Sequence, residues 1–568
     1  MSATDAVAGA APDATPGWHS LSWGKVWRNV RRLQTRIVKA VQQGRWGKVQ
    51  ALQHLLSHSF SGRAAAVLRV TSTSGAGTPG VDGDLWDSPQ KKTQAVQALQ
   101  SRGYHPRPLR RVYIPKSNGR KRPLGIPTLH DRAMQALYAL ALDPVAETCA
   151  DVNSYGFRRE RCCADALEQC HKALGGPHSA RWVLEGDIRS CFDRISHAWL
   201  EAHVCLPRTI LHKWLCCGYL EKGVRHETTE GTPQGGVISP ILMNLTLDGL
   251  ERLLHEHFAA TARQRQQNKV HLVRYADDFV ITGTSPQLLR NEVQPVVQRF
   301  LGERGLELSA EKTQITHSED GFDFLGQTVR RRRCERVLLT PSRRSVQRLL
   351  SQAKERIEHS GSWTAGELIA QLNPLLRGWT RYHRHAASSR TFARVERALF
   401  GLVWQWARKR HRGRSATWVK RKYFVQRGDR LWVFHGELPD RDGQPTPIYL
   451  VQVSRIRIRR HLKIRGDANP YDPSWEPYLE QRWQAQMTDS ETGVRQMRLL
   501  WRMQAGRCPL CHQKITLESG WHVHHNSWRV YGGSDRLDNL SLLHPHCHRQ
   551  LQARNKELGP TASCEGRS

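Results

Sequence analysis

The fold of this chain is decided by the stretch Val273-Arg-Tyr-Ala-Asp-Asp-Phe-Val-Ile281. Two runs rich in β-forming residues flank a tight turn that carries Asp277 and Asp278. The pattern predicts a β-hairpin whose tip holds two carboxylates, the ligands that hard cations prefer. Earlier in the chain, the run Trp182-Val-Leu-Glu-Gly-Asp187 predicts a second apolar strand that also ends in an aspartate.

Three aspartates at the ends of adjacent strands suit phosphoryl transfer. This reaction needs two Mg²⁺ ions held about 3.5–4 Å apart, so that the attacking and the leaving oxygens are both stabilised. Asp187, Asp277 and Asp278 can build such a clamp. An Asp-Asp turn alone is weaker evidence, because most such turns are simply solvated. The surrounding motifs must therefore decide between the two interpretations.

Those motifs follow one another in a fixed order, and in this order the chain resembles reverse transcriptases, among them the group II intron type. The resemblance covers nearly the whole chain after the first residues. The matching blocks are Thr78-Pro-Gly-Val-Asp-Gly83, Val112-Tyr-Ile-Pro-Lys116, Lys121-Arg-Pro-Leu-Gly-Ile-Pro127, Ser154-Tyr-Gly-Phe157, Gly186-Asp-Ile-Arg-Ser-Cys-Phe-Asp193, Gly231-Thr-Pro-Gln-Gly-Gly-Val-Ile-Ser-Pro240, Tyr275-Ala-Asp-Asp278, Gly305-Leu-Glu-Leu-Ser-Ala-Glu-Lys-Thr313 and Phe324-Leu-Gly326.

The resemblance implies roles for the acidic residues. Asp187, Asp277 and Asp278 would be the catalytic carboxylates, and Asp187 and Asp277 would coordinate Mg²⁺ most directly. Lys312 matches a lysine sometimes proposed to donate a proton to pyrophosphate. A solvated lysine at a strand end is the alternative for that position.

The resemblance also implies a site for deoxynucleoside triphosphates. Lys116 and Arg122 match residues of the fingers that grip the triphosphate, a use that suits a point charge and a planar guanidinium. Phe192 matches the residue that blocks a ribose 2′-hydroxyl, with packing in the core as the alternative. Gln234, in the Pro-Gln-Gly turn, would position nucleotide and template.

Charge points to a polyanionic partner. Lys and Arg number 86 against 51 Asp and Glu, which gives a formal net charge of +35. A compact body with this excess repels itself unless phosphate backbones neutralise it. The balance therefore favours a nucleic-acid partner over a merely soluble basic surface.

Composition also indicates in which cellular compartment the protein is expected. No run of about 18 apolar residues is present, so no spanning helix and no membrane partner are expected. The 13 cysteines form no small disulfide-rich module, which favours reduced thiols in a cytoplasm. We expect a cytoplasmic protein of the bacterial type that associates with the nucleoid when it is bound to DNA.

A segment after the polymerase motifs indicates which class of reverse transcriptase the chain resembles. Leu372-Asn-Pro-Leu-Leu-Arg-Gly-Trp-Thr-Arg-Tyr382 resembles the hallmark of the group II maturase domain, which retrons and retroviruses lack. Aromatic residues alternate with arginines here, as on surfaces that bind structured RNA. The candidates for contacts with intron RNA are Arg377, Arg381 and Arg384. The alternative is a helix bundle whose aromatic residues form its core. The RNA-binding surface and the aromatic core are compatible if the arginines face outward.

The C-terminal segment holds two pairs of metal-ligating residues. Cys508 and Cys511 have the spacing of zinc ligands, and His544 and Cys547 repeat it with a histidine in place of one cysteine. Four N/S ligands in two pairs predict a closed, tetrahedral, structural Zn²⁺ site.

With His524-His525 and Asn539 between the pairs, this segment resembles the HNH nucleases. The resemblance implies that His525 is the general base, that Asn539 orients the histidine loop, and that His524 and His548 bind a catalytic Mg²⁺. A neutral imidazole suits proton abstraction near neutral pH. Many relatives carry a further histidine where this chain has Gln552, so a zinc-stapled DNA-binding unit without nuclease activity is the alternative.

Three patterns between the motifs predict local structure. Residues Trp23 to Ser59 are expected to be helical, with Val26, Val30, Leu33, Ile37 and Val41 on one apolar face. Pro439 to Pro447 has the composition of a linker. Ser454 to His461 alternates apolar with basic residues and predicts a strand with one cationic face that holds target DNA.

The fold class that follows is multidomain α/β, with right-hand polymerase fingers and palm, an α-helical thumb/maturase domain and a small ββα-metal HNH domain. Six regions are expected in chain order: a disordered leader (1–20), an N-terminal extension and fingers (21–130), the fingers and palm (131–335), the thumb/maturase domain (336–430), a DNA-binding and linker region (431–487) and the HNH domain (488–560).

The function expected from this organisation is RNA-directed DNA polymerisation and intron splicing. The protein would help its intron RNA to splice, nick target DNA with the HNH domain, and copy the RNA from the exposed end. A domesticated splicing factor that no longer polymerises is one rival, and a reverse transcriptase with a role in defence is another. The sequence leaves open the identity of the intron and the oligomeric state.

Overall fold

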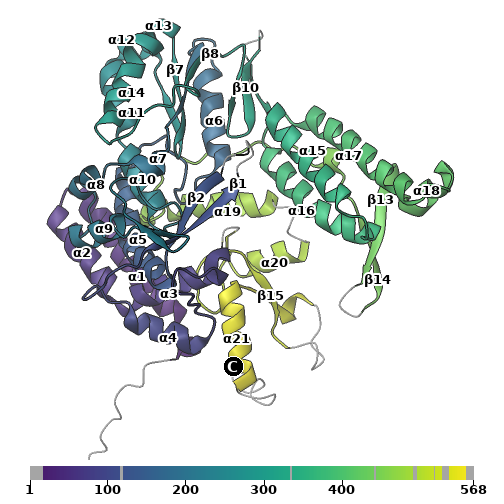
Figure 1. Cartoon of the computed structure of the whole chain (residues 1–568), viewed down its shortest axis with the longest axis horizontal. Coiled ribbons are helices and arrows are strands. Elements are labelled where there is room, and N and C mark those ends of the chain that lie inside the picture. Colours follow the sequence, from purple (N-terminus) through teal and green to yellow (C-terminus); the bar gives the residue numbers. More distant parts are fainter. Residues whose placement is uncertain are drawn as a thin grey trace, which may run out of the picture.

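The computed structural model describes residues 17–115, 119, 121–332, 336–439, 443–489, 495–516, 519–527 and 536–557. Lys116, one of the predicted nucleotide ligands, lies outside the described residues. The chain forms N-terminal helices, a palm with a fingers sheet, a helical thumb and a C-terminal unit (Figure 1). This arrangement agrees with the multidomain α/β class that the sequence predicts. No helix in the described ranges is long and apolar enough to cross a membrane.

The N-terminal helices pack around the buried helix α5 (Leu129–Cys149). They are α1 (Trp23–Gln42), α2 (Trp46–His58), α3 (Phe60–Ser72) and α4 (Pro89–Ala98). The five residues of the predicted apolar face of α1 are all buried, which confirms that prediction. The helical stretch is interrupted between α1 and α2, where Gly44 adopts a φ of +67°.

Part of the predicted leader is structured. Trp18–Ser20 forms a 3₁₀ turn (η1), and the Trp18 ring meets that of Trp23 edge to face at 5.1 Å. Trp18 is buried. The prediction of a disordered leader up to residue 20 is therefore wrong for these residues, because the Trp18 indole is buried in the core. Residues 1–16 lie outside the described part of the chain.

The palm is a four-stranded antiparallel sheet in the order β6-β7-β3-β8. Neighbouring residues of β3 point to opposite faces, as in any strand. Val183 lies in a core shared with α6, and Leu184 lies in the core shared with α10 and α14. The elements are β3 (Trp182–Asp187), β6 (Leu272–Tyr275), β7 (Asp278–Gly283), β8 (Gln314–His317), α6 (Cys163–Leu174), α10 (Ser239–Leu247), α11 (Leu250–Phe258) and α14 (Gln294–Gly302).

Two smaller sheets flank the palm. The fingers sheet has the order β2-β1-β4-β5, and a three-stranded sheet, β11-β10-β9, leads to the thumb. Their strands are β1 (Leu109–Pro115), β2 (Lys121–Ile126), β4 (Tyr219–Glu221), β5 (Val224–His226), β9 (Phe322–Phe324), β10 (Gln327–Arg331) and β11 (Val337–Pro341). Short helices complete this region: η2 (Ser74–Gly77), α7 (Cys191–Arg194), α8 (His197–His203), α9 (Arg208–Leu215), α12 (Ala262–Asn268), α13 (Pro286–Leu288) and the π-helix η3 (Leu289–Val293).

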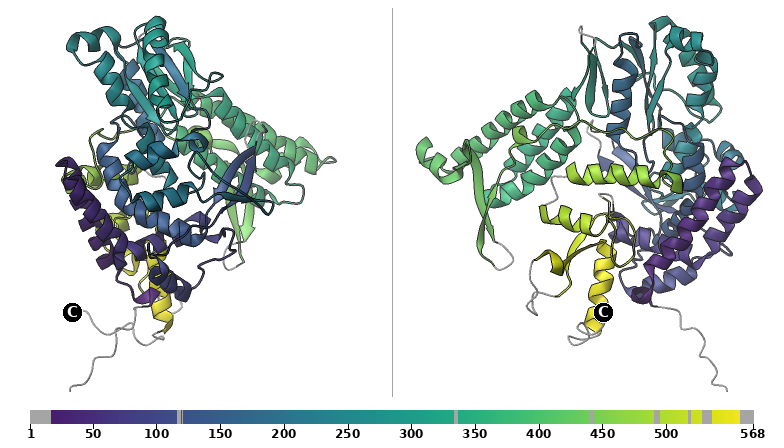
Figure 2. Two further views of the ribbon diagram at one scale, coloured as in Figure 1. Left: turned by 60° about the vertical axis from the view of Figure 1, so that its left-hand side comes forward. Right: turned by 180° about the vertical axis from the view of Figure 1, so that it is seen from behind.

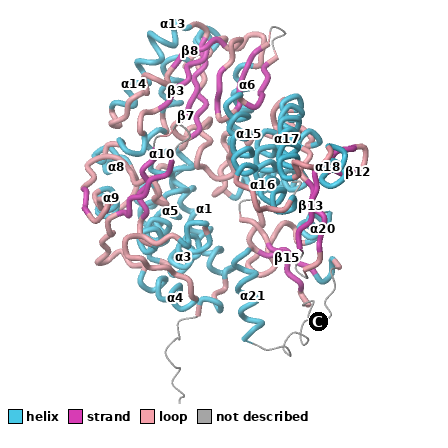
Figure 3. Tube along the Cα trace, turned by 45° about the vertical axis from the view of Figure 1, so that its right-hand side comes forward, coloured by secondary structure: helices cyan, strands magenta, loops and turns pink. Residues whose placement is uncertain are grey.

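The thumb contains α15 (Arg343–Glu358), α16 (Ala365–His383) and α17 (Ser389–Arg410), which lie side by side (Figure 3), followed by α18 (Ala416–Tyr423). A sheet of β12 (Phe424–Arg427), β13 (Arg430–Pro439) and β14 (Pro445–Tyr449) packs on α16 and shares its core. The linker predicted at Pro439 to Pro447 is thus wrong for the described residues, because Pro439 ends β13 and Pro445 and Pro447 lie in β14. The prolines of β14 are tolerated because β14 is an edge strand.

The predicted cationic strand at Ser454 to His461 is also wrong. The segment begins with a 3₁₀ turn, η4 (Val453–Arg455), and then runs without a strand partner. Its backbone amides form hydrogen bonds with the thumb instead. The Ser454 amide donates to Glu396, and the Arg459 amide donates to the Arg384 carbonyl. Alternation alone could not reveal these long-range partners.

Beyond this segment the chain returns to the palm. Asp165 at the start of α6 accepts hydrogen bonds from the Ile464 amide at 2.7 Å and from the Arg482 guanidinium at 3.0 Å, and His461 lies 2.9 Å away. Two helices follow, η5 (Pro473–Trp475) and α19 (Glu476–Asp489). The buried carboxylate therefore fixes residues 461–482 on the palm.

The C-terminal unit docks on the N-terminal helices (Figure 2). The Gln550 amide donates to the backbone carbonyls of His19 and Leu21, and the Trp23 ring lies 6.0 Å from the His546 ring. Its apolar residues belong to the same core as those helices. Its elements are α20 (Arg495–Met503), β15 (His522–His525), η7 (Leu537–Asn539), β16 (Leu540–Leu543) and α21 (Pro545–Glu557).

Candidate active sites

The palm brings the three predicted carboxylates together. Asp187 ends β3 and stands directly opposite Asp278, the first residue of β7. Asp277 lies beside it in the turn of the β6–β7 hairpin, where Ala276 adopts a φ of +58°. The strand pairing thus places all three side chains at one end of the sheet, as the sequence predicts. This is the arrangement that a pair of hard cations requires.

Burial and mutual repulsion determine the electrostatics of this carboxylate site. Burial raises the pKa of Asp277, and the neighbouring Asp187 raises it further. Burial and the charges of Asp277 and Asp187 raise the pKa of Asp278 to about 6. Divalent cations would remove this repulsion, since they favour the ionised form of each carboxylate.

Lys312 supplies a positive charge at the same place. Its Nζ lies 2.8 Å from Oδ2 of Asp187. Lys312 is therefore paired with a candidate catalytic carboxylate and is not simply solvated. An ammonium at this position can balance the Asp187 charge and is close enough to act on groups bound there.

On the fingers side, two hydrogen bonds link three polar side chains. The Arg122 guanidinium donates to the side-chain oxygen of Gln234 at 2.9 Å, and the Gln234 amide donates to Asp193 at 3.1 Å. Arg122 and Gln234 were predicted from their motifs, whereas Asp193 was not singled out although its motif contains it. Arg122 also lowers the pKa of Asp277, so it lies within electrostatic reach of the carboxylates.

Phe192 lies between core and site. Its side chain is only 9% exposed, yet its ring meets the 54% exposed Phe157 edge to face at 6.4 Å. The turn that carries Gln234 packs tightly behind it: a Cβ on Gly231, whose φ is +83°, would lie 2.7 Å from the Phe192 carbonyl oxygen. The Phe192 backbone is thus closely packed against this turn, while its ring is buried beside Phe157.

On the thumb, α16 carries the predicted RNA-binding residues Arg377 and Arg381, and Arg384 directly follows this helix. Arg377 is exposed, and Arg381 and Arg384 are half-buried. The aromatic Trp379 instead points inward, where its ring lies 5.6 Å from Phe392 and its Nε1 donates to Ser345. The Trp379 indole therefore packs in the thumb core, whereas Arg377 is exposed to solvent.

A second basic surface lies where the palm meets the thumb. A cleft of about 860 Å³ runs between β11, α15 and α17. Among the described residues, its lining contains four arginines, Arg332, Arg343, Arg390 and Arg394, and no acidic residue. No local sequence pattern predicts this cleft, because its residues come from three separate elements.

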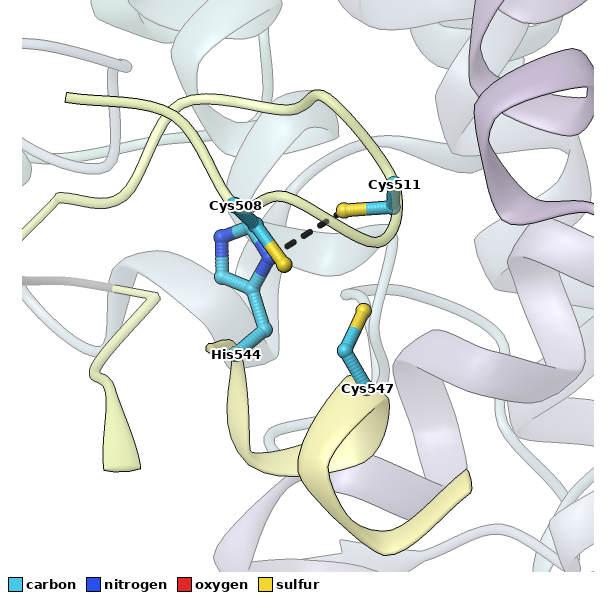
Figure 4. A group of neighbouring side chains, drawn as sticks. All are labelled: Cys508, Cys511, His544 and Cys547. Atoms are coloured by element: carbon cyan, nitrogen blue, oxygen red, sulfur yellow. Dashed lines mark hydrogen bonds between the residues drawn. The ribbon is translucent and has the colours of Figure 1, made fainter. Parts of the chain in front are cut away.

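The C-terminal unit gathers the four predicted zinc ligands. Cys508, Cys511, His544 and Cys547 are buried, and their ligand atoms all lie within 4.8 Å of one another (Figure 4). Nε2 of His544 lies 3.0 Å from the Lys514 carbonyl, which can only accept a hydrogen bond. The proton of the neutral ring therefore sits on Nε2, and Nδ1 faces the sulfurs, 3.3 Å from Cys511. Three sulfurs and one nitrogen fit a tetrahedral Zn²⁺.

The nuclease motif lies beside this cluster. His525 ends β15, and the loop that follows is clamped by Asn539, whose side chain accepts from the Ser527 amide and donates to the Ser527 carbonyl. The His524 ring lies 5.3 Å from that of His548. Burial and the charges of His548 and His525 lower the pKa of His524 to about 4. The fold thus brings His524 and His548 together and places Asn539 at the histidine loop, as the resemblance implies.

Four protein families match the chain in order. "N-terminal domain of reverse transcriptase" matches residues 18–99, and "Reverse transcriptase (RNA-dependent DNA polymerase)" matches residues 114–329. "Group II intron, maturase-specific domain" matches residues 346–424, and "HNH endonuclease" matches residues 508–554. These matches cover the palm carboxylates, the thumb helices and the zinc cluster.

Individual relatives agree with the family matches. Protein YkfC of Escherichia coli is 38% identical over 47% of this chain and 80% of its own length. The group II intron-encoded protein LtrA of Lactococcus lactis is 34% identical over 46% of this chain, which spans only 54% of LtrA. A telomerase structure from Candida albicans aligns with 56% of this chain and 64% of its own, with 12% identity and a TM-score of 0.32.

Proposed function

Since the chain belongs to the group II intron-encoded reverse transcriptases, we propose that it copies RNA into DNA at Asp187, Asp277 and Asp278. The observation that carries this proposal is the convergence of the three carboxylates at the end of β3 and the β6–β7 hairpin. The test is extension of a DNA primer on an RNA template, with Asp277→Ala as the inactive comparison.

In this proposal, Asp187 and Asp277 hold two Mg²⁺ ions, which stabilise the attacking and leaving oxygens. Lys312, paired with Asp187, balances charge next to the departing pyrophosphate. Arg122 binds the triphosphate of the incoming nucleotide, and Gln234 holds Arg122 in place through its hydrogen bond. Lys116 remains a predicted ligand of the same triphosphate.

Phe192 is proposed to select deoxynucleotides. A ring at this position would exclude a ribose 2′-hydroxyl and accept a deoxyribose. The edge-to-face contact with the exposed Phe157 supports a position of Phe192 at the edge of the site, although Phe192 itself is buried. Packing in the core and contact with the nucleotide are thus compatible for Phe192.

The thumb is proposed to bind the intron RNA and assist its splicing. Support comes from the maturase-specific family match and from the arginines outside the α16 core. The arginine-lined cleft between palm and thumb extends this basic surface. Structured RNA meets such surfaces chiefly through phosphate contacts, which makes the affinity depend on salt.

We expect the triple variant Arg377→Ala, Arg381→Ala, Arg384→Ala to bind the intron RNA with a weaker salt dependence. Each lost phosphate contact should reduce the slope of log affinity against log salt by about 0.7–0.9. Filter binding over a series of salt concentrations measures this slope. Replacement of the exposed palm arginines Arg263, Arg290 and Arg299 is the matched control. An unchanged slope in the thumb variant would place the RNA contacts elsewhere.

The C-terminal unit is proposed to nick target DNA and expose the 3′ end that the palm extends. His525 is the general base for water, and Asn539 holds its loop through the two hydrogen bonds to Ser527. His524 and His548 would bind the catalytic metal, and the cluster of Cys508, Cys511, His544 and Cys547 would hold a structural Zn²⁺. The basic segment Ser454 to His461 remains a candidate contact for the target DNA.

His525→Ala should reduce the rate of DNA nicking by about 10²–10⁴-fold, the usual contribution of a general base. Polymerisation from a supplied primer should be unchanged, because the palm does not use this residue. Cleavage of a labelled target duplex and primer extension measure the two activities on the same preparation. Nicking at the wild-type rate would mean that another group activates the water.

A further inference from the structure

A further cluster of metal-ligating side chains lies where the segment after the thumb returns to the palm. The ligand atoms of Cys162, Asp165 and His461 all lie within 4.8 Å of one another. Sγ of Cys162 lies 3.2 Å from Oδ2 of Asp165 and 4.0 Å from Nε2 of His461. The same Nε2 lies 2.9 Å from Oδ1 of Asp165. These residues belong neither to the palm carboxylates nor to the nuclease motif.

Two distant segments of the chain build this cluster. Cys162 is the N-cap residue of α6 and Asp165 lies in its first turn, so a capping box brings the two side chains together. His461 comes from the segment that follows the thumb. The Asp165 side chain is fully buried and that of His461 is 9% exposed, whereas Cys162 is exposed. An ion can therefore reach the cluster from the side of the thiol.

The carboxylate at the centre of the cluster is held in a fixed orientation. Asp165 accepts hydrogen bonds from the Cys162 amide at 2.9 Å and the Ile464 amide at 2.7 Å, and Arg482 donates to both carboxylate oxygens at 3.0 and 3.1 Å. Carboxylates that bind metals are typically hydrogen-bonded in this way, because outer partners orient the ligand. The Asp165 oxygens are thus preset beside the thiol and the imidazole.

The distances fit a single tetrahedral ion. Zn²⁺ bound at about 2.3 Å to sulfur and about 2.0–2.2 Å to nitrogen and oxygen places these ligands about 3.4–3.6 Å apart. The measured distances of 3.2, 4.0 and 2.9 Å differ from those values by about 0.5 Å or less. Small side-chain rotations remove this difference. Three protein ligands leave the fourth position to water.

Hydrogen bonding alone explains the thiol poorly. The Ile464 amide and Arg482 already bind Asp165 and hold the returning segment on the palm. A helix N-cap favours Ser, Thr, Asp or Asn, and a thiol is only a weak acceptor. A thiol beside an imidazole and a carboxylate is instead a set of donors that Zn²⁺ binds.

We propose that Cys162, Asp165 and His461 bind one divalent transition-metal ion of the Zn²⁺ class, which ties the segment after the thumb to the palm. A thiolate ligand selects such ions over Mg²⁺, which requires oxygen ligands. The role is structural, because the ion joins α6 to a segment far away in the sequence. The proposal goes beyond polymerisation, splicing and nicking and depends on none of them.

The test is an absorption titration of the full chain with Co²⁺. The chain first receives one equivalent of Zn²⁺, which occupies the cluster of Cys508, Cys511, His544 and Cys547. Millimolar Mg²⁺ occupies the palm carboxylates. Since Co²⁺ binds such ligands more weakly than Zn²⁺, the zinc stays in place. The near-ultraviolet band of a Co²⁺–thiolate bond then detects an ion bound to a further cysteine, and histidine sites do not contribute to it. The wild type should gain one equivalent of this band.

Two variants remove one ligand each. Cys162→Ser should abolish the thiolate band and leave the helix start intact, because serine is a favoured N-cap residue. His461→Gln should weaken Co²⁺ binding by at least about 10–100-fold, the loss that follows removal of even an outer-shell partner. Cys149→Ser, which changes an exposed cysteine at the end of α5, is the matched control and should titrate like the wild type.

Zinc content and unfolding temperature without Co²⁺ should be the same in all four proteins, which shows that the variants fold. Absence of the thiolate band from the wild type at millimolar Co²⁺ would overturn the proposal and identify a purely hydrogen-bonded cluster. A wild-type band in Cys162→Ser would overturn it as well, and so would wild-type affinity in His461→Gln. Primer extension and DNA nicking are measured separately, so failure of this metal site leaves the proposed function intact.

Discussion

Replacement of Cys508 by alanine is expected to unfold the C-terminal unit and release it from the N-terminal helices. Structural zinc contributes about 10–16 kcal/mol to small domains, which is as large as the whole stability of a typical domain, about 5–15 kcal/mol. Cys508 is fully buried among the other three ligands. Its loss removes one of four bonds to the ion and leaves a gap in a core that the unit shares with α1.

Metal analysis and limited proteolysis measure this effect. The wild type should carry one zinc per chain, and Cys508→Ala should carry none and be cleaved rapidly after about residue 489. A chelator should produce the same cleavage pattern in the wild type. Cys216→Ala, which removes an exposed cysteine, is the control and should change neither result. A zinc-containing, protease-resistant Cys508→Ala protein would contradict the structural role of the cluster.

Asp277→Ala is expected to abolish cDNA synthesis while intron splicing survives. A metal clamp supplies several kcal/mol of transition-state stabilisation, and at 1.36 kcal/mol per factor of ten this amounts to about three orders of magnitude or more. The side chain lies in a hairpin turn, so its removal leaves no hole in the apolar core. Splicing, which we propose depends on RNA contacts of the thumb, should continue at close to the wild-type rate.

Primer extension on an RNA template and splicing of a precursor RNA are measured on the same preparation. Asp320→Ala is the matched control, because this exposed aspartate follows β8 at the opposite end of β3 from Asp187. It should leave both activities unchanged. Loss of splicing together with polymerisation in Asp277→Ala would show that the two functions do not reside in separate surfaces.

Local patterns and the order of the motifs together predicted the placement of the three palm carboxylates. The β6–β7 hairpin with Asp277 and Asp278 forms from neighbouring residues, whereas Asp187 joins them through the pairing of β3 with β7, which the order of the motifs indicated. The cluster of Cys508, Cys511, His544 and Cys547 could be predicted equally well, because each pair of ligands has a spacing that only a few turns allow. The apolar face of α1 followed from helical periodicity and is buried as predicted. The family matches confirm the assignment to group II intron-encoded reverse transcriptases.

Features that depend on distant contacts could not be predicted in this way. Pro445 and Pro447 indicate a linker until the partner strand β13 is known. The alternation around Ile456 indicates a strand, but the backbone there follows hydrogen bonds to the thumb and to Asp165. In each case the partner lies far away in the sequence, and no local pattern encodes the contact.

The measurement that tests the central claim most directly is extension of a DNA primer on a defined RNA template by the purified wild-type chain. With dNTPs and Mg²⁺, we expect a full-length DNA complementary to the RNA, and no product when the template is first destroyed by ribonuclease. Binding of the intron RNA is measured on the same sample. A chain that binds this RNA but incorporates no dNTP at any Mg²⁺ or Mn²⁺ concentration would contradict the claim and identify a splicing factor that no longer polymerises.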